Sequence, residues 1–545
     1  MFGYEFVSLT KEQVEARRQL LDQAGFQAYL VPIIILVLTY TGRRTIPNSS
    51  NNQYKRNIGR LELISRRISW LLNTTYIGEF GPLRVQLLGL LYTAFLLFRI
   101  TYRTGNDYMH VTKAFGHVAV AQLPLHYLLS IKSPSSPITL ATGLTHERLN
   151  AYHRLFGRII HALLATHAIL YLRFFALMNL LPKRIKDTDV RLGIVAFWSL
   201  NFLGILAIPP IRAAIYHKVF YRSHAILSAV LVVVLWFHVP YTRIYVAQAA
   251  FFWILNGILR NGASQPVKVT CKAASKHLIQ VTMKTSGKHL HPYLPGVHVY
   301  LNAGGLGPRT PFTVLSARAL GNGISQIELI AKNSGGPMTG SFARVAEEGR
   351  ELELQLEGPY GEAQQYMPLL LNNKDTKRQK ALLVAGGVGA TYALPIFKAL
   401  AEARGSAADL KFVWVMRTAQ DLRWAQNYLR DSKLTPSIEL SITRASSSEQ
   451  EALAKETEQG PTVTTSRPNF DGIVDSFFTL KAEANSSGKQ DRQKLKRDYD
   501  PIIVMVCGPA SLTNALRKSV GRYVWEYGRD VKWYEEQFGF GGSQV

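Results

Sequence analysis

The stretch AYHRLFGRIIHALLATHAILYL, residues 151–172, is apolar enough to lie in a membrane as a helix, yet it carries three histidines. His153 and His167 are 14 positions apart (167 − 153), a separation that places them within about 40° of each other around an α-helix. His161 lies roughly 80° to 120° away from both and does not share their face. Because an ionisable side chain inside a membrane helix is costly, the pair on one face indicates a function.

A second apolar stretch, RSHAILSAVLVVVLWFHVP at 222–240, repeats the same spacing with His224 and His238 (238 − 224 = 14). One apolar segment lies between the two stretches, so the two helices run in the same direction. His153 is then expected to face His224, and His167 to face His238. Imidazole is a good axial ligand for haem iron, and two stacked haems form an electron path across a bilayer. The alternative is that each histidine is satisfied by a backbone carbonyl or a polar neighbour.

The chain has 545 residues, 47% of them hydrophobic, and the long apolar runs fall almost entirely before residue 262. We expect seven membrane spans, at 27–42, 84–101, 110–131, 155–176, 191–209, 221–239 and 243–259. The span at 110–131 is the least regular because it contains three more histidines, which are expected to be structural or to contact a metal or quinone. The basic connection at 43–83 places the N-terminus outside and the C-terminal half in the cytoplasm.

The net charge of +26 does not indicate a nucleic-acid-binding protein, because the basic residues are scattered through loops without interleaved aromatic residues. Basic loops on the cytoplasmic side and sites for anionic cofactors account for the charge. Only two cysteines are present, Cys271 and Cys507, so neither a disulfide framework nor a cysteine-based metal cluster is expected.

The C-terminal half is typical of a soluble protein with two domains. Short alternating strands with Gly/Pro turns predict an antiparallel β-barrel over 265–372. The segment KALLVAGGVGATYALPIFKAL at 380–400 then predicts a strand, a glycine turn and a helix, in which Gly386, Gly387 and Gly389 let the backbone approach a phosphate. The next strand ends in Arg417, not in the acidic residue that accepts the ribose hydroxyl of NAD, and this favours NADPH.

These features together resemble the fungal ferric reductase transmembrane family, within the wider ferric reductase and NADPH oxidase group. The paired His-x13-His motifs, the segment GHVAVAQLPL at 116–125 and the soluble module behind them carry the resemblance over nearly the whole chain. It implies a multi-domain membrane protein: an α-helical transmembrane haem domain, then an antiparallel β-barrel FAD domain and an α/β NADPH-binding domain of the ferredoxin reductase type. The expected bounds are 1–26 for an N-terminal segment, 27–262 for the di-haem domain, 265–372 for the FAD barrel, and 378–545 for the NADPH domain with mobile loops near 444–466 and 484–500.

The resemblance also implies site residues. The haem ligands are His153, His167, His224 and His238. The FAD contacts come from RTPFTVLSA, the glycine stretch KNSGGPMTGSF and the turn EGPYG, namely Pro311, Phe312, Thr313, Gly336, Thr339, Gly358, Tyr360 and Gly361, with Arg309 as an alternative contact to the pyrophosphate. The family has His where this chain has Thr310. The nicotinamide nucleotide is approached by Arg467 near the 2′-phosphate and by Cys507, Gly508 and Pro509, and Phe540 replaces the usual aromatic residue on the flavin ring.

The function that the resemblance implies is reduction of ferric chelates or siderophores, with Cu(II) as a second substrate. Electrons would pass from cytosolic NADPH through FAD and two b-type haems to the far side of the plasma membrane, with an iron permease as a possible partner. One alternative is an NADPH oxidase that reduces O₂. The equal 14-residue spacing favours the metal reductase, because oxidases of the group have one residue fewer in one pair. A second alternative is an inactive membrane scaffold.

Overall fold

The computed structural model describes residues 3–45, 60–215, 219–286, 293–304, 307–372, 379–429, 434–444, 461–478 and 501–536. The chain forms two compact units. The first contains Met1–Arg56 and Leu72–Ala263, and the second contains Asn57–Leu71 and Ser264–Phe540. The chain therefore enters the second unit briefly before it completes the first.

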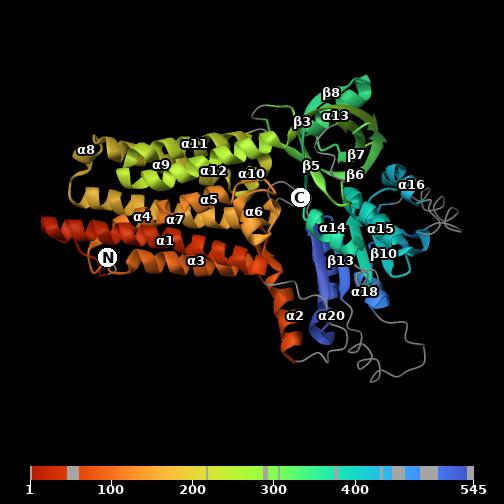
Figure 1. Cartoon of the computed structure of the whole chain (residues 1–545), viewed down its shortest axis with the longest axis horizontal. Coiled ribbons are helices and arrows are strands. Elements are labelled where there is room, and N and C mark those ends of the chain that lie inside the picture. The colour runs from red at the N-terminus through yellow and green to blue at the C-terminus, as the bar shows by residue number, and fades with distance from the viewer. Residues whose placement is uncertain are drawn as a thin grey trace. The chain divides into compact units, whose positions relative to one another are not determined.

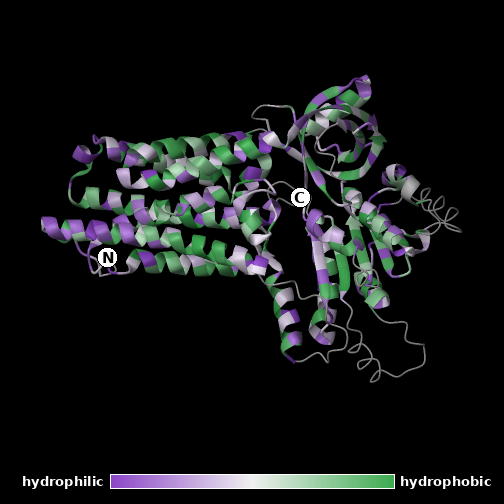
Figure 2. Ribbon diagram, viewed as in Figure 1, coloured by the Kyte–Doolittle hydropathy of each residue, from purple (hydrophilic) through white to green (hydrophobic). Residues whose placement is uncertain are grey.

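The first unit is a bundle of long helices that lie side by side (Figure 1). The long helices are α1 (Lys11–Thr45), α3 (Leu83–Thr101), α4 (Tyr108–Val120), α7 (His146–Leu177), α9 (Thr188–Leu206), α11 (Tyr221–His238) and α12 (Arg243–Gly262). Shorter elements connect them: β1 (Thr75–Ile77), β2 (Gly81–Pro82), α5 (Leu123–Leu128), α6 (Pro137–Thr142), α8 (Leu181–Arg184) and α10 (Pro209–Ile215). Hydrophobic residues predominate along these helices (Figure 2). Large apolar side chains such as Leu38, Leu91 and Phe237 are more than half exposed. Such a surface suits a lipid environment.

Five of these helices, α1, α3, α7, α9 and α11, are long and apolar enough to cross a membrane. The sequence predicted seven spans, and the other two differ from a plain apolar helix. The segment at 110–131 is broken after Val120, with Pro124 in the first turn of α5. In α12, Gln248 and Asn256 lower the hydropathy, and each has a partner within the bundle: Tyr29 donates to Gln248 at 2.6 Å, and Asn256 accepts from the Lys132 N–H at 3.1 Å.

The second unit begins with the predicted antiparallel barrel. Its strands are β3 (Ser264–Ala273), β4 (Leu278–Ser286), β5 (His298–Asn302), β6 (Thr310–Gly321), β7 (Ile324–Lys332) and β8 (Leu352–Tyr360), closed in the order β3-β4-β7-β6-β5-β8. Helix α13 (Pro337–Glu348) packs against β3 and β4. In β4 the buried side chains alternate with less buried ones, as expected for strands with one face on a core. The expected barrel is confirmed.

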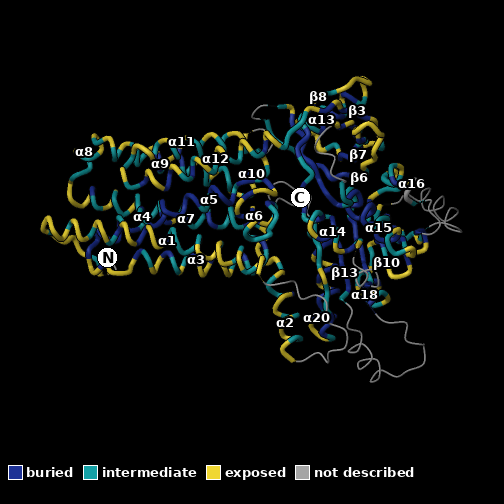
Figure 3. The backbone as a smooth tube through the Cα atoms, in the orientation of Figure 1, coloured by how far each residue is buried: buried dark blue, intermediate teal, exposed yellow. Residues whose placement is uncertain are grey.

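The rest of this unit is a parallel sheet of six strands in the order β12-β11-β10-β9-β13-β14. The strands are β9 (Ala381–Gly386), β10 (Leu410–Met416), β11 (Ile438–Ile442), β12 (Thr462–Thr464), β13 (Ile502–Cys507) and β14 (Val531–Glu536), and the helices are α14 (Ala363–Asn372), α15 (Ala390–Arg404), α16 (Gln426–Leu429), α18 (Phe470–Phe478) and α20 (Ala510–Tyr527). The central strands β9 and β13 are buried almost along their whole length (Figure 3). The chain builds outward from β9 to β12 and then crosses back to β13, so the strand order reverses between β9 and β13. In open parallel sheets, ligands bind at the carboxyl ends of the strands where this reversal occurs.

The predicted loops near 444–466 and 484–500 lie mostly outside the described residues. The first of them ends in a strand, because β12 occupies Thr462–Thr464 and pairs in parallel with β11. A single hydrophobic core joins the barrel to the sheet, and it includes Val299 and Phe342 from the barrel and Leu383 and Phe397 from the α/β part.

Helix α2 (Arg60–Leu72) is the segment through which the chain enters this unit early. Its Trp70 is only 9% exposed and meets the ring of Trp533 edge-on, with 5.6 Å between ring centroids. The guanidinium of Arg517 on α20 lies 4.3 Å above the Trp70 ring and donates a hydrogen bond to the Trp70 carbonyl at 3.2 Å. A desolvated cation over an indole is a favourable contact, so Trp70 anchors α2 on the α/β domain.

Two further arginines of α2 bind the end of α20. Arg66 donates to the Gly528 carbonyl at 2.9 Å, and Arg67 donates to the Trp525 carbonyl at 2.6 Å. The last carbonyls of a helix lack partners within the helix and carry partial negative charge, so cationic donors stabilise them. The sequence indicated only a basic loop here.

Replacing Trp70 by Ala is expected to destabilise the α/β domain by about 3 kcal/mol, because it removes a buried indole. Cys507 lies in the core of that domain and is fully buried, so its labelling by a thiol reagent in a Cys271→Ser background reports domain opening. We expect labelling to begin roughly 5 to 10 °C lower than in the parent. Ile68→Ala is the matched control, since Ile68 is on the same helix but 48% exposed; equal shifts for the two variants would contradict this role of Trp70.

Candidate functional site

The first histidine pair lies where the sequence placed it, between α7 and α11. The rings of His153 and His224 have centroids 6.3 Å apart and planes at 73°. Two imidazoles on opposite sides of one metal ion, each about 2 Å from ligand nitrogen to metal, have ring centres roughly 6 Å apart. The separation therefore fits one metal ion between the two rings.

Backbone carbonyls fix the orientation of three of the four predicted ligands. The Nδ1 atoms of His167 and His238 each lie 2.8 Å from a carbonyl oxygen, that of Thr112 and that of Asp189, respectively. The Nδ1 of His153 lies 3.3 Å from a third carbonyl, that of His126. A carbonyl only accepts, so Nδ1 must carry the hydrogen, and the Nε2 lone pair is left for a metal.

The fourth ligand, His224, differs from the other three. Its Nδ1 is buried and has no hydrogen-bond partner among the described residues. His161, the third histidine of residues 151–172, has a hydrogen-bond partner within the protein. Its Nε2 lies 3.0 Å from the Asn201 side-chain oxygen. This contact agrees with the expectation that His161 lies off the ligand face.

Two glycines on neighbouring helices leave space for the imidazole rings of the second pair, His167 and His238. A Cβ at Gly116 of α4 would lie 2.7 Å from Cε1 of His167, and a Cβ at Gly193 of α9 would lie 2.9 Å from Cε1 of His238. Any larger residue at these positions would displace the imidazole. The two rings thus rest directly on the backbone of adjacent helices.

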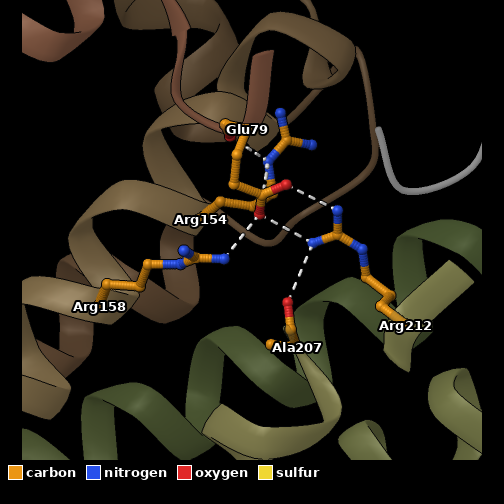
Figure 4. A network of polar contacts seen from close by, with 5 residues as sticks. All are labelled: Glu79, Arg154, Arg158, Ala207 and Arg212. Carbon is orange, nitrogen blue, oxygen red and sulfur yellow. Dashed lines mark hydrogen bonds and ion pairs between the residues drawn. The ribbon is translucent and has the colours of Figure 1, made fainter. Parts of the chain in front are cut away.

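Arginines cluster around the carboxylate of Glu79 (Figure 4), and one of them, Arg154, directly follows His153 on α7. Glu79 is 10% exposed and pairs with Arg212 at 2.8 Å, with Arg158 at 2.9 Å and with Arg154 at 3.7 Å. Arg154 also donates to the Glu79 carbonyl at 2.9 Å. Three guanidinium groups against one carboxylate leave this part of the bundle positively charged. The sequence analysis missed the cluster because its members are far apart along the chain.

In the second unit, the predicted glycine turn lies between the carboxyl ends of β9 and β13. A Cβ at Gly389 would lie 2.3 Å from the carbonyl oxygen of Cys507, and one at Gly386 would lie 2.8 Å from the ring of Pro509. These two glycines therefore let two loops of the protein approach each other. Gly387 faces open space with φ of +55°, and it is the turn glycine placed to admit a ligand.

Cys507 ends β13 beside that turn, and it is followed by Gly508 in the neighbouring loop. Burial raises the pKa of its thiol well above the ordinary value, and the carboxylates of Glu536 and Glu535 raise the pKa further. The thiol is neutral at physiological pH, so Cys507 is not a thiolate nucleophile. Its side chain is fully buried, so it packs within the core of the domain.

Three arginines follow the carboxyl ends of consecutive strands. Arg417 follows β10, Arg444 lies just beyond β11, and Arg467 lies beyond β12. All three are exposed, and the Arg444 N–H donates to the Arg417 carbonyl at 3.0 Å. Carboxyl ends of parallel strands share one edge of the sheet, so the three cations lie along the edge at which open parallel sheets generally bind ligands. The sequence analysis named Arg417 and Arg467 but missed Arg444.

The predicted flavin segment is the first part of strand β6. Phe312 is buried with its ring centroid 5.5 Å from that of Phe342, so its side chain belongs to the barrel core. Thr313 is 6% exposed, and its hydroxyl is buried with no hydrogen-bond partner among the described residues. Pro311 lies opposite Tyr300 on the neighbouring strand β5. The unsatisfied Thr313 hydroxyl is the atom of this segment that fits a bound polar ligand.

Arg309 lies just before β6 and pairs with a buried carboxylate. Its Nε is 2.9 Å from Glu357 of β8, and the hydroxyl of Tyr360 donates to the same carboxylate at 2.8 Å. This network connects the start of β6 to the end of β8. Gly358 and Gly361 lie within two positions of Tyr360 in the sequence.

The other predicted flavin contacts are placed as follows. Gly336 immediately precedes α13, and the Thr339 hydroxyl is 3.4 Å from the Gly336 carbonyl. The Thr339 hydroxyl thus forms a local hydrogen bond within the first turn of α13. Phe540 lies outside the described residues.

Comparison with known proteins agrees with both halves of this description. Residues 115–235 match the family model of the ferric reductase like transmembrane component, and residues 379–521 match that of the ferric reductase NAD binding domain. Both family models describe domains of ferric reductases. The resemblance expected from the sequence is therefore confirmed in the bundle and in the α/β sheet.

Relatives of modest identity carry the same kind of name. The chain is 24% identical to the probable cell surface ferric reductase kap2 of Aspergillus oryzae, over 58% of this chain and 44% of that protein, so it spans less than half of that relative. It is 22% identical to the probable metalloreductase AIM14 of Lachancea thermotolerans, over 90% and 93% of the two chains. It is 21% identical to the ferric/cupric reductase transmembrane component 2 of Schizosaccharomyces pombe, over 78% and 80%.

Solved structures align at low scores. A flavohemoglobin from Malassezia yamatoensis with bound FAD and heme aligns with a TM-score of 0.36 at 16% identity, over 77% of this chain and 96% of its own. A ferredoxin NADP⁺ reductase from Neisseria gonorrhoeae aligns with a TM-score of 0.32 at 14% identity, over 50% and 98%.

Gly389→Ala is expected to disturb the nucleotide turn, because the new Cβ would meet the Cys507 carbonyl. We expect the KM for NADPH in reduction of an artificial dye to rise at least tenfold, or activity to be lost, as the two loops move apart. Gly340→Ala is the control, since Gly340 lies in helix α13 with open space around its Cβ position. An unchanged KM in Gly389→Ala would show that the close contact of the two loops is not needed for binding.

Proposed function

We propose that this protein transfers electrons from NADPH, through FAD and two b-type haems, to a ferric chelate on the opposite side of a membrane. The observation that carries the proposal is the arrangement of the four histidines on α7 and α11. Three of them are held by Nδ1 on backbone carbonyls, and the ring separation of the first pair fits one metal ion. Haem is the metal group that two apolar, parallel helices with paired imidazoles suit best.

His153 with His224 would hold one haem and His167 with His238 the other. Iron in such a site supplies one-electron chemistry. The protein contributes the ligands, their orientation and a dry setting. The carbonyls of Thr112 and Asp189 keep the second pair in the tautomer that coordinates metal, and Gly116 and Gly193 keep those rings in position.

The crevice at the ends of β9 and β13 would hold the nicotinamide nucleotide, with the barrel beside it for the flavin. FAD supplies the step between hydride and single electrons, which neither nicotinamide nor haem performs alone. Gly387 would give the nucleotide access to the backbone, and the Thr313 hydroxyl would offer a hydrogen bond in the barrel. Arg417, Arg444 and Arg467 provide positive charge for the 2′-phosphate of NADPH.

The path of the chain supports one order of the two proposed haems. A short turn of Pro240–Thr242 joins α11 to α12, so α12 returns toward the end of α11 that carries His224. The chain then leaves α12 at Gly262 and enters β3 at Ser264. The His153/His224 pair therefore lies at the end that leads to the flavin and nucleotide domains, and it is the first acceptor in the proposed path.

The direct test is spectroscopic. Purified protein is expected to contain two b-type haems per chain, both reduced by NADPH under anaerobic conditions and both reoxidised when a ferric chelate is added. The measurement is a reduced-minus-oxidised spectrum with a haem count. Absence of haem would overturn the proposal, whereas reoxidation by O₂ with superoxide but not by the chelate would indicate an oxidase.

Arg444→Gln is expected to raise the KM for NADPH by about tenfold and to leave the KM for NADH unchanged, because a charge-assisted contact to a phosphate contributes about 1.5–3 kcal/mol. The measurement is steady-state dye reduction with each nucleotide. Arg318→Gln, an exposed arginine on barrel strand β6, controls for loss of one positive charge. Equal changes with the two nucleotides would argue against a contact to the 2′-phosphate.

A further inference from the structure

A third imidazole lies against the His153/His224 pair. His126 belongs to the short helix α5, which follows the break after α4. Its ring is stacked on that of His153, with centroids 4.2 Å apart and planes within 8° of parallel. Neither the helical spacing of the ligand pairs nor the proposed function accounts for a third histidine here.

The surroundings of His126 do not explain it as a structural residue. Its Nδ1 is buried and has no hydrogen-bond partner among the residues that the structure describes. A buried polar nitrogen without a partner costs about 1–3 kcal/mol, and an aliphatic side chain would fill the same space without that cost. By contrast, the Nε2 of His161 lies 3.0 Å from the Asn201 side-chain oxygen.

The helix that carries His153 is shaped to receive the His126 ring. A Cβ at Gly157, one turn beyond His153, would lie 2.8 Å from Cε1 of His126. The imidazole therefore lies flush against the α7 backbone. His153 is in turn held by the carbonyl of His126 itself, at 3.3 Å, a longer contact than the 2.8 Å of His167 and His238. Helix α5 therefore carries the His126 ring and also supplies the carbonyl that orients the His153 ring.

We propose that His126 is a reserve axial ligand on the α7 side of this haem site and can replace His153 at the iron. The inference rests on the proposed function, because it requires haem between α7 and His224. The two stacked rings lie about one ring thickness apart, so removal of one leaves room for the other.

The exchange is simple in chemical terms. One imidazole–iron bond breaks and one imidazole–iron bond forms, with no change in the number of electrons. The incoming imidazole is neutral and coordinates through an unprotonated nitrogen, so no proton is released. His224 remains the ligand on the other side throughout.

The test compares two single substitutions in the full-length protein. His153→Ala is expected to retain two low-spin haems per chain, with shifted electron paramagnetic resonance g-values for one of them, because His126 takes over. His167→Ala is the matched control on the same helix, and the ring that meets His167 edge-on is that of Tyr171. It is expected to lose one haem or to convert it to a high-spin form.

The double variant His126→Leu/His153→Ala decides whether His126 is the replacement. It is expected to behave like His167→Ala, whereas His126→Leu alone keeps two low-spin haems. Dye reduction by NADPH in each variant checks that the soluble unit is folded. If His153→Ala already loses one low-spin haem, or if the double variant keeps both, the inference is overturned. If the unsubstituted protein has no haem, the proposed function itself fails, and the two failures are thus distinguished.

Discussion

The bundle depends on how a neutral imidazole is held in an apolar helix. A ring nitrogen buried among hydrocarbon needs a partner, and the carbonyls of Thr112 and Asp189 provide one for His167 and His238. Thr112 belongs to α4 and Asp189 to α9, so each carbonyl is fixed by the helix that carries it. The direction of each imidazole is therefore set by the packing of α4 and α9 against the ligand helices, and two widely separated segments must be in place before the pair can face a common ligand.

A comparable constraint shapes the turn between β9 and β13. The strand order reverses between β9 and β13, and the two loops at that point come so close that Gly386 and Gly389 have no space for a side chain. Glycines in such a turn are usually explained by a phosphate that approaches the backbone. In this protein, two of the three glycines are already required by close contact with the Cys507–Pro509 loop. Protein packing alone therefore accounts for these two glycines.

Features that depend on local pattern could be predicted from the sequence, and features that depend on distant contacts could not. The 14-residue spacing identified the ligand faces, and alternation identified the barrel, because both follow from the geometry of one element. Membership of α2 in the second unit depends on Trp70 meeting Trp533, more than four hundred residues away. The environment of Glu79 likewise depends on Arg154 and Arg212, which no local pattern connects to it.

The Glu79 cluster bears on the direction of the proposed electron path. Arg154 directly follows His153 in the sequence. With Arg158, Arg212 and Glu79 it forms a cluster of three guanidinium groups and one carboxylate, whose net charge is +2 (3 − 1). Fixed positive charge stabilises a nearby group that gains an electron, more strongly where burial lowers the dielectric response. The charge lies at the end of α7 where the chain path places the first acceptor, so the charge distribution and the connectivity favour the same starting point for electrons in the bundle.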